Sequence, residues 1–284
     1  MKKYILEECC EILDSKRIPI TEKDRIAGIY PYYGANGIQD YVNEYIFDDE
    51  LVLLAENGGN FGSKEFNQIG IYRTTRRKNM ECIEWLFFDV GSTLMNEEKA
   101  YLHRLHDVAD AVNKTFEEIY DMAITLYKEN KKGDLEIMRL YGLPKLKWYK
   151  EDEDLYADTF EVLDELSKKY KIGVIANQSL GTAERLEQKG ILKFIDLVIA
   201  SAEEGISKPD KRIFEIALSR AKCNAENAIM IGDRIDNDIV PAKQMGMKTI
   251  WIKQGFGKYW NVAREEEKAD YEIDNLISIL SLLG

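Results

Sequence analysis

Polar residues follow apolar, strand-like runs at three widely separated points, and this pattern constrains the fold more than any other feature. Asp89 follows the run 85–88, Lys208 comes after a second such run, and Asp233 follows 229–232. In a parallel α/β sheet the carboxyl ends of the strands lie at one edge, where ligands bind. A carboxylate nucleophile, a lysine and an acidic pair are therefore predicted to meet there, an arrangement suited to Mg²⁺-dependent phosphoryl transfer.

The chain after residue 82 alternates between strand-like and helix-like segments, as repeated βαβ units do. Strands are predicted at 172–177, 196–200, 227–232 and 248–252, and helices at 157–170, 181–189, 210–221, 236–245 and 273–283. Within 97–150, Tyr101, Leu105 and Val108 recur at helical spacing, and Thr115 is a predicted N-cap.

The composition is that of an acidic protein with enough apolar residues for a core. The 284 residues are 45% hydrophobic and carry a formal net charge of -12, which argues against broad nonspecific nucleic-acid binding. No run reaches the roughly 18 apolar residues of a membrane span, so no membrane contact is predicted. The four cysteines lack CxxC or zinc spacing, and we expect free thiols in the cytoplasm.

Residues 1–80 differ in residue pattern from the rest of the chain. Short strand-like runs are broken by glycine, proline and asparagine, and Asn36-Gly37 is a turn signal between β-prone segments. The region carries 11 lysines and arginines against 13 acidic residues, a net charge of -2. We expect a small α+β or β-rich segment at 1–72, followed by a polar, exposed linker at 73–81.

Three stretches of this N-terminal segment, 16–20, 30–38 and 53–64, carry a family resemblance. In order and spacing they resemble part of a target-recognition domain from the specificity subunit of type I restriction–modification systems. That family reads DNA sequence beside a methyltransferase. Here the resemblance stops after the opening half of such a domain, and no basic footprint accompanies it. We therefore expect a truncated domain and do not expect DNA as a partner.

Residues 82–284 resemble the haloacid dehalogenase-like (HAD) hydrolase superfamily, in the branch with a small helical cap after the first strand. Four ordered blocks carry this resemblance, and an ordered set is far more specific than any one block. The resemblance implies a Rossmann-like, three-layer parallel sheet. It also implies a catalytic core made of 82–96 and 151–284, with the helical cap at 97–150.

The same resemblance assigns roles to the residues of the blocks. Asp89 would attack phosphorus and form an aspartyl-phosphate that water later hydrolyses. Asp89, the backbone carbonyl of Gly91 and Asp233 would bind Mg²⁺, which needs few protein ligands because it keeps several waters. Asp238 would hold a metal-bound water or pair with Lys208. Lys208 would neutralise both the nucleophile and the incoming phosphate.

Gly91 departs from the family pattern. Most phosphatases of this family carry a second aspartate there, as general acid and base. Such a group is worth about 10²–10⁴-fold in rate, so its loss predicts slow turnover or a good leaving group. A substitute acid from the cap region is the other possibility, and the candidates are Glu97, His103 and His106.

Ala176 is a second departure, since the family normally ends this strand in a serine or threonine that binds a phosphoryl oxygen. Asn177 would take over that contact, with Gln178 or Ser179 assisting. Thr93 is expected to tie the loop after the nucleophile.

The sequence thus predicts a Mg²⁺-dependent phosphohydrolase that acts on a small phosphate ester. One alternative is a catalytically weak relative that binds a phosphorylated ligand, which Gly91 and Ala176 favour. Another is a DNA-binding specificity module, which only residues 1–70 favour.

Overall fold

The computed structural model describes residues 27–34, 37–42, 50–53, 70–73 and 83–283. The chain divides into two compact units, Met1–Glu81 and Cys82–Gly284. In the first unit, β1 (Ala27–Gly34) pairs antiparallel with β2 (Gly37–Val42), on either side of the predicted turn. A second antiparallel pair joins β3 (Glu50–Leu53) to β4 (Gly70–Arg73). The predicted linker and stretches 16–20 and 54–64 lie outside the described residues.

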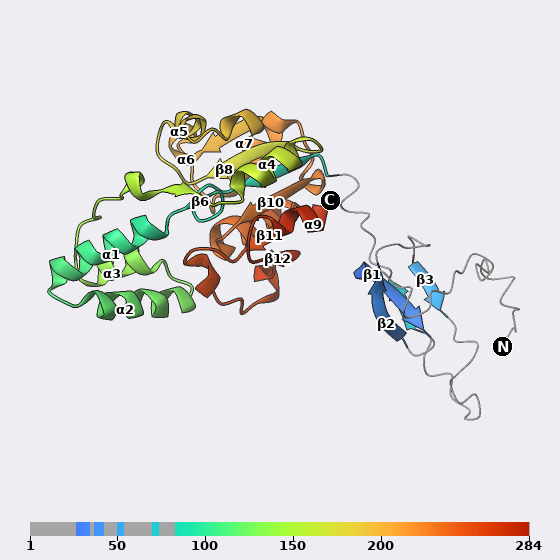
Figure 1. The fold of residues 1–284 in the computed structure, drawn as a ribbon, viewed down its shortest axis with the longest axis horizontal. Helices are drawn as coiled ribbons and strands as arrows, with labels where there is room; N and C mark the ends of the chain where they lie inside the picture. The colour runs from blue at the N-terminus through green and yellow to red at the C-terminus, as the bar shows by residue number, and fades with distance from the viewer. Residues whose placement is uncertain (1–26, 35–36, 43–49, 54–69, 74–82, 284) are drawn as a thin grey trace, which may run out of the picture. The chain divides into compact units, whose positions relative to one another are not determined.

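The second unit is built on a six-stranded sheet in the order β12-β11-β10-β5-β8-β9, with every neighbouring pair parallel (Figure 1). Its strands are β5 (Trp85–Phe88), β8 (Lys171–Ala176), β9 (Leu197–Ala200), β10 (Ala228–Gly232), β11 (Lys248–Ile252) and β12 (Tyr271–Ile273). A two-stranded ribbon pairs β6 (Met95–Asn96) with β7 (Asp154–Leu155). The predicted Rossmann-like α/β class is confirmed.

Helices cover both faces of this sheet, which explains why its central strands are continuously apolar. Phe87 on β5 packs with Phe214 of α7, whereas Leu86 and Phe88 point to the opposite face because side chains alternate along a strand. All three β5 residues are fully buried. The core helices are α4 (Thr159–Ser167), α5 (Thr182–Gln188), α6 (Ser201–Glu204), α7 (Lys211–Ala221), α8 (Val240–Met245) and α9 (Ser278–Leu283).

Three helices are inserted after β6, in the predicted cap region: α1 (Glu98–Val112), α2 (Phe116–Lys128) and α3 (Gly133–Leu140). Figure 1 shows them side by side, beyond the edge of the sheet. Thr115 caps α2 as predicted, in a reciprocal capping box with Glu118. Buried cap residues such as Leu105 and Val108 pack in one apolar cluster with Trp251 and Phe256 of the core.

Two predicted elements differ from the structure. The helix predicted at 273–283 is in part wrong, because Tyr271–Ile273 pairs with β11 as the sixth strand and α9 begins only at Ser278. The helix predicted at 236–245 starts with a π-helical turn, η8 (Ile235–Ile239), before α8. The first error arises because short apolar runs do not distinguish strand from helix. No helix among the described residues is long and apolar enough to cross a membrane.

Candidate active site

The carboxyl ends of β5 and β10 bring the predicted acidic residues together. Asp89 directly follows β5, Asp233 directly follows β10, and Asp238 lies on the π-helical turn that comes next. One carboxylate oxygen from each lies within 4.8 Å of the others. The strands place them there because β5 and β10 are adjacent and parallel.

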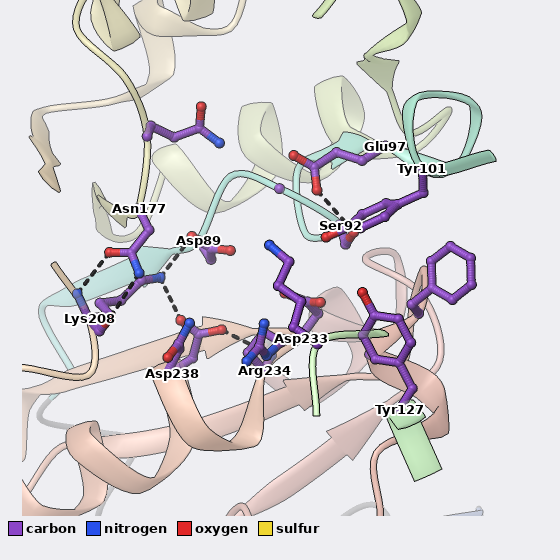
Figure 2. A pocket seen from close by; sticks show the side chains of 16 residues that line it. Asp89, Ser92, Glu97, Tyr101, Tyr127, Asn177, Lys208, Asp233, Arg234 and Asp238 are labelled. Atoms are coloured by element: carbon purple, nitrogen blue, oxygen red, sulfur yellow. Dashed lines mark hydrogen bonds and ion pairs between the residues drawn. The ribbon is translucent and has the colours of Figure 1, made fainter. Parts of the chain in front are cut away.

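Lys208 links two of these carboxylates from the opposite side. Its ammonium Nζ lies 2.7 Å from Asp89 Oδ1 and 2.5 Å from Asp238 Oδ1, and the residue is only 4% exposed. Burial lowers the pKa of Lys208, but the charges of Asp238 and Asp89 outweigh it and hold the pKa above its usual value. Figure 2 shows the three side chains joined by these contacts.

Asn177 holds the backbone that carries Lys208. Its Nδ2 donates to the Lys208 carbonyl at 2.8 Å, and its Oδ1 accepts from the Lys208 N–H at 2.8 Å. Both ends of the amide are therefore engaged, so a contact from Asn177 to phosphate would come from its backbone. Gln178 also lines the cavity, with its Oε1 accepting from Arg185. The Ser179 hydroxyl contacts Lys150 and is not among the cavity residues.

Asp233 is the member of this group best suited to a cation. Within the described part of the chain, the one hydrogen bond to Asp233 is accepted by its backbone carbonyl and none by its carboxylate, and the residue is only 6% exposed. Burial and the nearby charges of Asp238 and Asp89 raise the pKa of Asp233 well above its usual value. Burial likewise raises the pKa of Asp238 to about 6 despite Lys208. Three crowded carboxylates with one lysine between them are the oxygen ligands that Mg²⁺ prefers.

Comparisons with known proteins identify the family. The sequence profile of the family described as haloacid dehalogenase-like hydrolase matches residues 86–252. The chain belongs to this family. The predicted enzyme class, a HAD-like hydrolase, is thereby confirmed. The profile of the type I restriction modification DNA specificity domain matches residues 1–78, in agreement with the resemblance seen in the N-terminal stretches.

Curated relatives in the HAD family are named as phosphatases. A glyceraldehyde 3-phosphate phosphatase of Pyrococcus furiosus is 30% identical over 72% of this chain and 94% of its own length. That of Methanocaldococcus jannaschii is 37% identical over 45% of this chain, a match that covers 56% of the relative. A Bacillus subtilis HAD-hydrolase structure bound to magnesium shares the fold, with a TM-score of 0.53 at 20% identity over 71% of this chain and 99% of its own.

The space beside Gly91 is filled by Glu97, where the HAD pattern has an aspartate. A Cβ atom added to Gly91 would lie 2.5 Å from Glu97 Oε1 and 2.6 Å from Oε2. The Glu97 carboxyl is 8% exposed and accepts a hydrogen bond from the Ser92 hydroxyl at 3.3 Å. Burial, only partly offset by Lys132, raises the pKa of Glu97 to about 8. In Figure 2 Glu97 and Ser92 lie on the other side of Asp89 from Lys208.

The two histidines named as substitute acids are engaged elsewhere. His103 Nδ1 lies 2.9 Å from Asp152, and the ring stacks on Tyr149. His106 stacks on Phe116 with ring centroids 3.9 Å apart. Neither histidine lines the cavity, whereas Glu97 does. Thr93 is fully buried and its hydroxyl is without a hydrogen-bond partner, so the expected tie comes only from its backbone.

The structure adds a group of cavity residues that the sequence did not indicate. They include Tyr101, Tyr127, Lys132, Arg234 and Phe256. Tyr101, Tyr127 and Lys132 come from the cap, and their spacing in the sequence fits ordinary helix packing. Of these three residues, only Lys132 carries a sequence signal, a charged residue next to the start of a helix. Such charges are too common to mark a cavity residue.

Proposed function

We propose that this chain is a Mg²⁺-dependent phosphohydrolase that acts on a small phosphate ester through an aspartyl-phosphate on Asp89. The observation that carries the proposal is Asp89 at a strand end, beside a buried Lys208 and two further carboxylates. The names of the curated relatives support phosphate-ester hydrolysis. The cavity, of about 90 Å³, is far below the roughly 300 Å³ of an ordinary ligand pocket and favours a small substrate.

Asp89, Asp233 and the Gly91 carbonyl would hold the metal, and Asp238 would act through Lys208 or a bound water. When bound, Mg²⁺ would offset the negative charge of the phosphoryl oxygens. The unpaired carboxylate of Asp233 supports this assignment, because its charge has no protein cation within ion-pair distance in the described structure.

In the first step an Asp89 oxygen bonds to phosphorus while the bond from phosphorus to the leaving oxygen breaks. Lys208 holds the Asp89 carboxylate in place and attracts the phosphate. In the second step water attacks phosphorus, the bond to Asp89 breaks, and inorganic phosphate leaves. Asn177 and Gln178 would bind phosphoryl oxygens during both steps, Asn177 through its backbone.

Glu97 would supply the proton that the absent aspartate supplies elsewhere in the family. Its carboxyl occupies the space beside Gly91, and it is the one substitute named from the sequence that lines the cavity. It would give its proton to the leaving oxygen in the first step and take one from water in the second.

Hydrolysis of p-nitrophenyl phosphate by the full chain, with Mg²⁺ and then with excess chelator, tests the proposal. We expect phosphate release that stops when the metal is removed and returns when Mg²⁺ is added back. The p-nitrophenolate leaving group needs little protonation, so turnover does not depend on the identity of the acid. Turnover that persists in chelator would contradict a metal-dependent mechanism.

A catalytically weak protein that binds a phosphorylated ligand is the second candidate, and Ala176 and Gly91 favour it. Calorimetry would then detect phosphate-ester binding without turnover of any ester. The match of residues 1–78 to a DNA specificity domain supports a third possibility. A gel shift repeated at several salt concentrations tests it, since phosphate contacts make affinity fall steeply with salt.

A further inference from the structure

We propose that Lys132, on the cap, selects substrates whose leaving group carries a carboxylate. The inference rests on the proposed function for the identity of the phosphate end of the ligand. It adds a second anchoring point, which would distinguish this chain's substrate from a neutral phosphate ester of the same size.

Lys132 lies in the loop between α2 and α3 and lines the same cavity as Asp89 and Lys208. Its Nζ lies 5.8 Å from the ring centroid of Tyr101, and its charge acts on the Glu97 carboxyl. Glu97 occupies the space beside Gly91, where a proton donor would meet the leaving oxygen. Lys132 is therefore on the leaving-group side of the cavity.

The ammonium group of Lys132 differs from the neighbouring cations in having no anionic partner. Lys208 contacts Asp89 and Asp238, and Arg234 Nη2 lies 2.6 Å from Asp236. Lys132 takes part in no ion pair or side-chain hydrogen bond with any residue that the structure describes. A half-buried cation that makes no direct ion pair within the described residues favours an anionic ligand.

The loop that carries Lys132 is held tightly, so the backbone from which its side chain extends is fixed beside the cavity. A Cβ on Gly133 would lie 2.6 Å from the Ala123 carbonyl, which shows how closely the loop backbone packs on α2. Asp134 is 1% exposed and binds Arg104 at 2.7 Å, and Arg104 is itself 3% exposed. Preorganisation of this kind lowers the entropy cost of binding a ligand.

The size of the cavity limits the anion to a small one. At about 90 Å³ the cavity is small for a ligand pocket, which favours a leaving group of only a few carbons. Tyr101, Tyr127 and Phe256 form an aromatic wall there and are all at most 8% exposed. A carboxylate on a two- or three-carbon chain satisfies both the charge and the space.

A matched pair of ligands tests the inference: 3-phosphoglycerate and glyceraldehyde 3-phosphate, which differ only in carboxylate against aldehyde. Binding is measured by calorimetry with Mg²⁺ on the Asp89→Asn chain, which cannot form the phospho-enzyme, with and without Lys132→Met. Lys131→Met is the control, since Lys131 pairs with exposed Glu129 and does not line the cavity.

We expect Lys132→Met to weaken 3-phosphoglycerate binding about 10- to 100-fold, the range for a lost charged hydrogen bond, and the aldehyde far less. Lys132→Arg should keep much of the preference for the carboxylate. Equal losses for both ligands would overturn the inference, because Lys132 would then only offset the charges of Glu97 and Asp233. Unchanged affinity for both would overturn it as well.

A second variant and the use of an inactive chain separate a failure of this inference from a failure of folding or of the proposed function. Lys132→Gln replaces the methionine variant if tryptophan fluorescence shows that the latter is unfolded. Because binding is measured on a chain that cannot turn over, a carboxylate preference without phosphate release by the wild type would contradict the proposed function and leave the assignment of Lys132 in place.

Discussion

The two sides of the cavity differ in how their charged groups are fixed. On the core side, Asp89 directly follows β5, and Lys208 contacts both Asp89 and Asp238 at 2.5–2.7 Å. On the other side, Glu97 and Lys132 come from the segment after the first strand and from the cap, and neither has an ion-pair partner among the described residues. Under the two proposals made above, the residues at the sheet edge would carry out the chemistry and the groups around the cap would select the substrate.

The largest expected effect is loss of the core side. Asp89→Asn should lower the turnover of p-nitrophenyl phosphate by at least about 10⁴-fold, because it removes the group that bonds to phosphorus. Phosphate release in saturating substrate measures this. Asp210→Asn is the matched control, since Asp210 pairs with Arg212 on the surface. Comparable losses of turnover in both variants would show that the effect is not specific to Asp89.

Glu97→Gln should show a loss that depends on the leaving group. We expect about 10²–10⁴-fold slower hydrolysis of an alkyl phosphate and a much smaller change with p-nitrophenyl phosphate, because only the alkoxide needs a proton. The kcat values for the two esters provide the measurement. A uniform loss for both esters would assign Glu97 a structural role instead.

An exchange of positions sharpens this prediction. Gly91→Asp alone should disturb the site, since its Cβ would lie 2.5 Å from Glu97 Oε1. Combined with Glu97→Ala, it should recover much of the alkyl phosphate activity that Glu97→Ala loses. If the double variant is no faster than Glu97→Ala, the two positions do not share one role.

Mg²⁺ should raise the free energy of unfolding of the second unit, an effect smaller than the losses of activity above. At a concentration 100 times its dissociation constant, a ligand raises the free energy of unfolding by about 2.7 kcal/mol. We expect such a rise for the wild type and little of it for Asp233→Asn. The four tryptophans, Trp85, Trp148, Trp251 and Trp260, all lie within 82–284, so their fluorescence reports unfolding of this unit. An equal rise in both proteins would place the metal elsewhere.

The pH dependence of stability gives the smallest effect for a change of one pH unit. Burial raises the pKa of Glu97 from 4.5 to about 8, so in this window the folded state keeps a proton that the unfolded state has lost. The stabilisation is therefore complete below 4.5 and decreases as pH rises through about 8, by up to about 1.4 kcal/mol per pH unit. The Glu97→Gln variant has no ionisable group at this position. Without metal, its free energy of unfolding should therefore fall less steeply with rising pH than that of the wild type. Parallel curves would contradict the buried, protonated state of Glu97.

Most of the core could be predicted from the sequence, because its signals are local. Apolar runs followed by polar residues located β5 and β10 and the residues after them, and the helix predicted at 210–221 agrees with α7 to within one residue. The metal and catalytic roles of Asp89, Lys208 and Asp233 stay predictions until they are tested. The strand at Tyr271–Ile273 was missed because its pairing with β11 is a nonlocal contact.

The residue types and their order along the chain determined the parallel α/β core, the family, and the meeting of Asp89, Lys208 and the acidic pair. These follow from the sequence because parallel strands necessarily end at one edge. Only the tertiary structure showed that Glu97, not His103 or His106, fills the space beside Gly91, and that Lys132 lines the cavity without an ion pair to any described residue. Those facts depend on how the cap packs on the core, and no local pattern of residues encodes where a single side chain then lies.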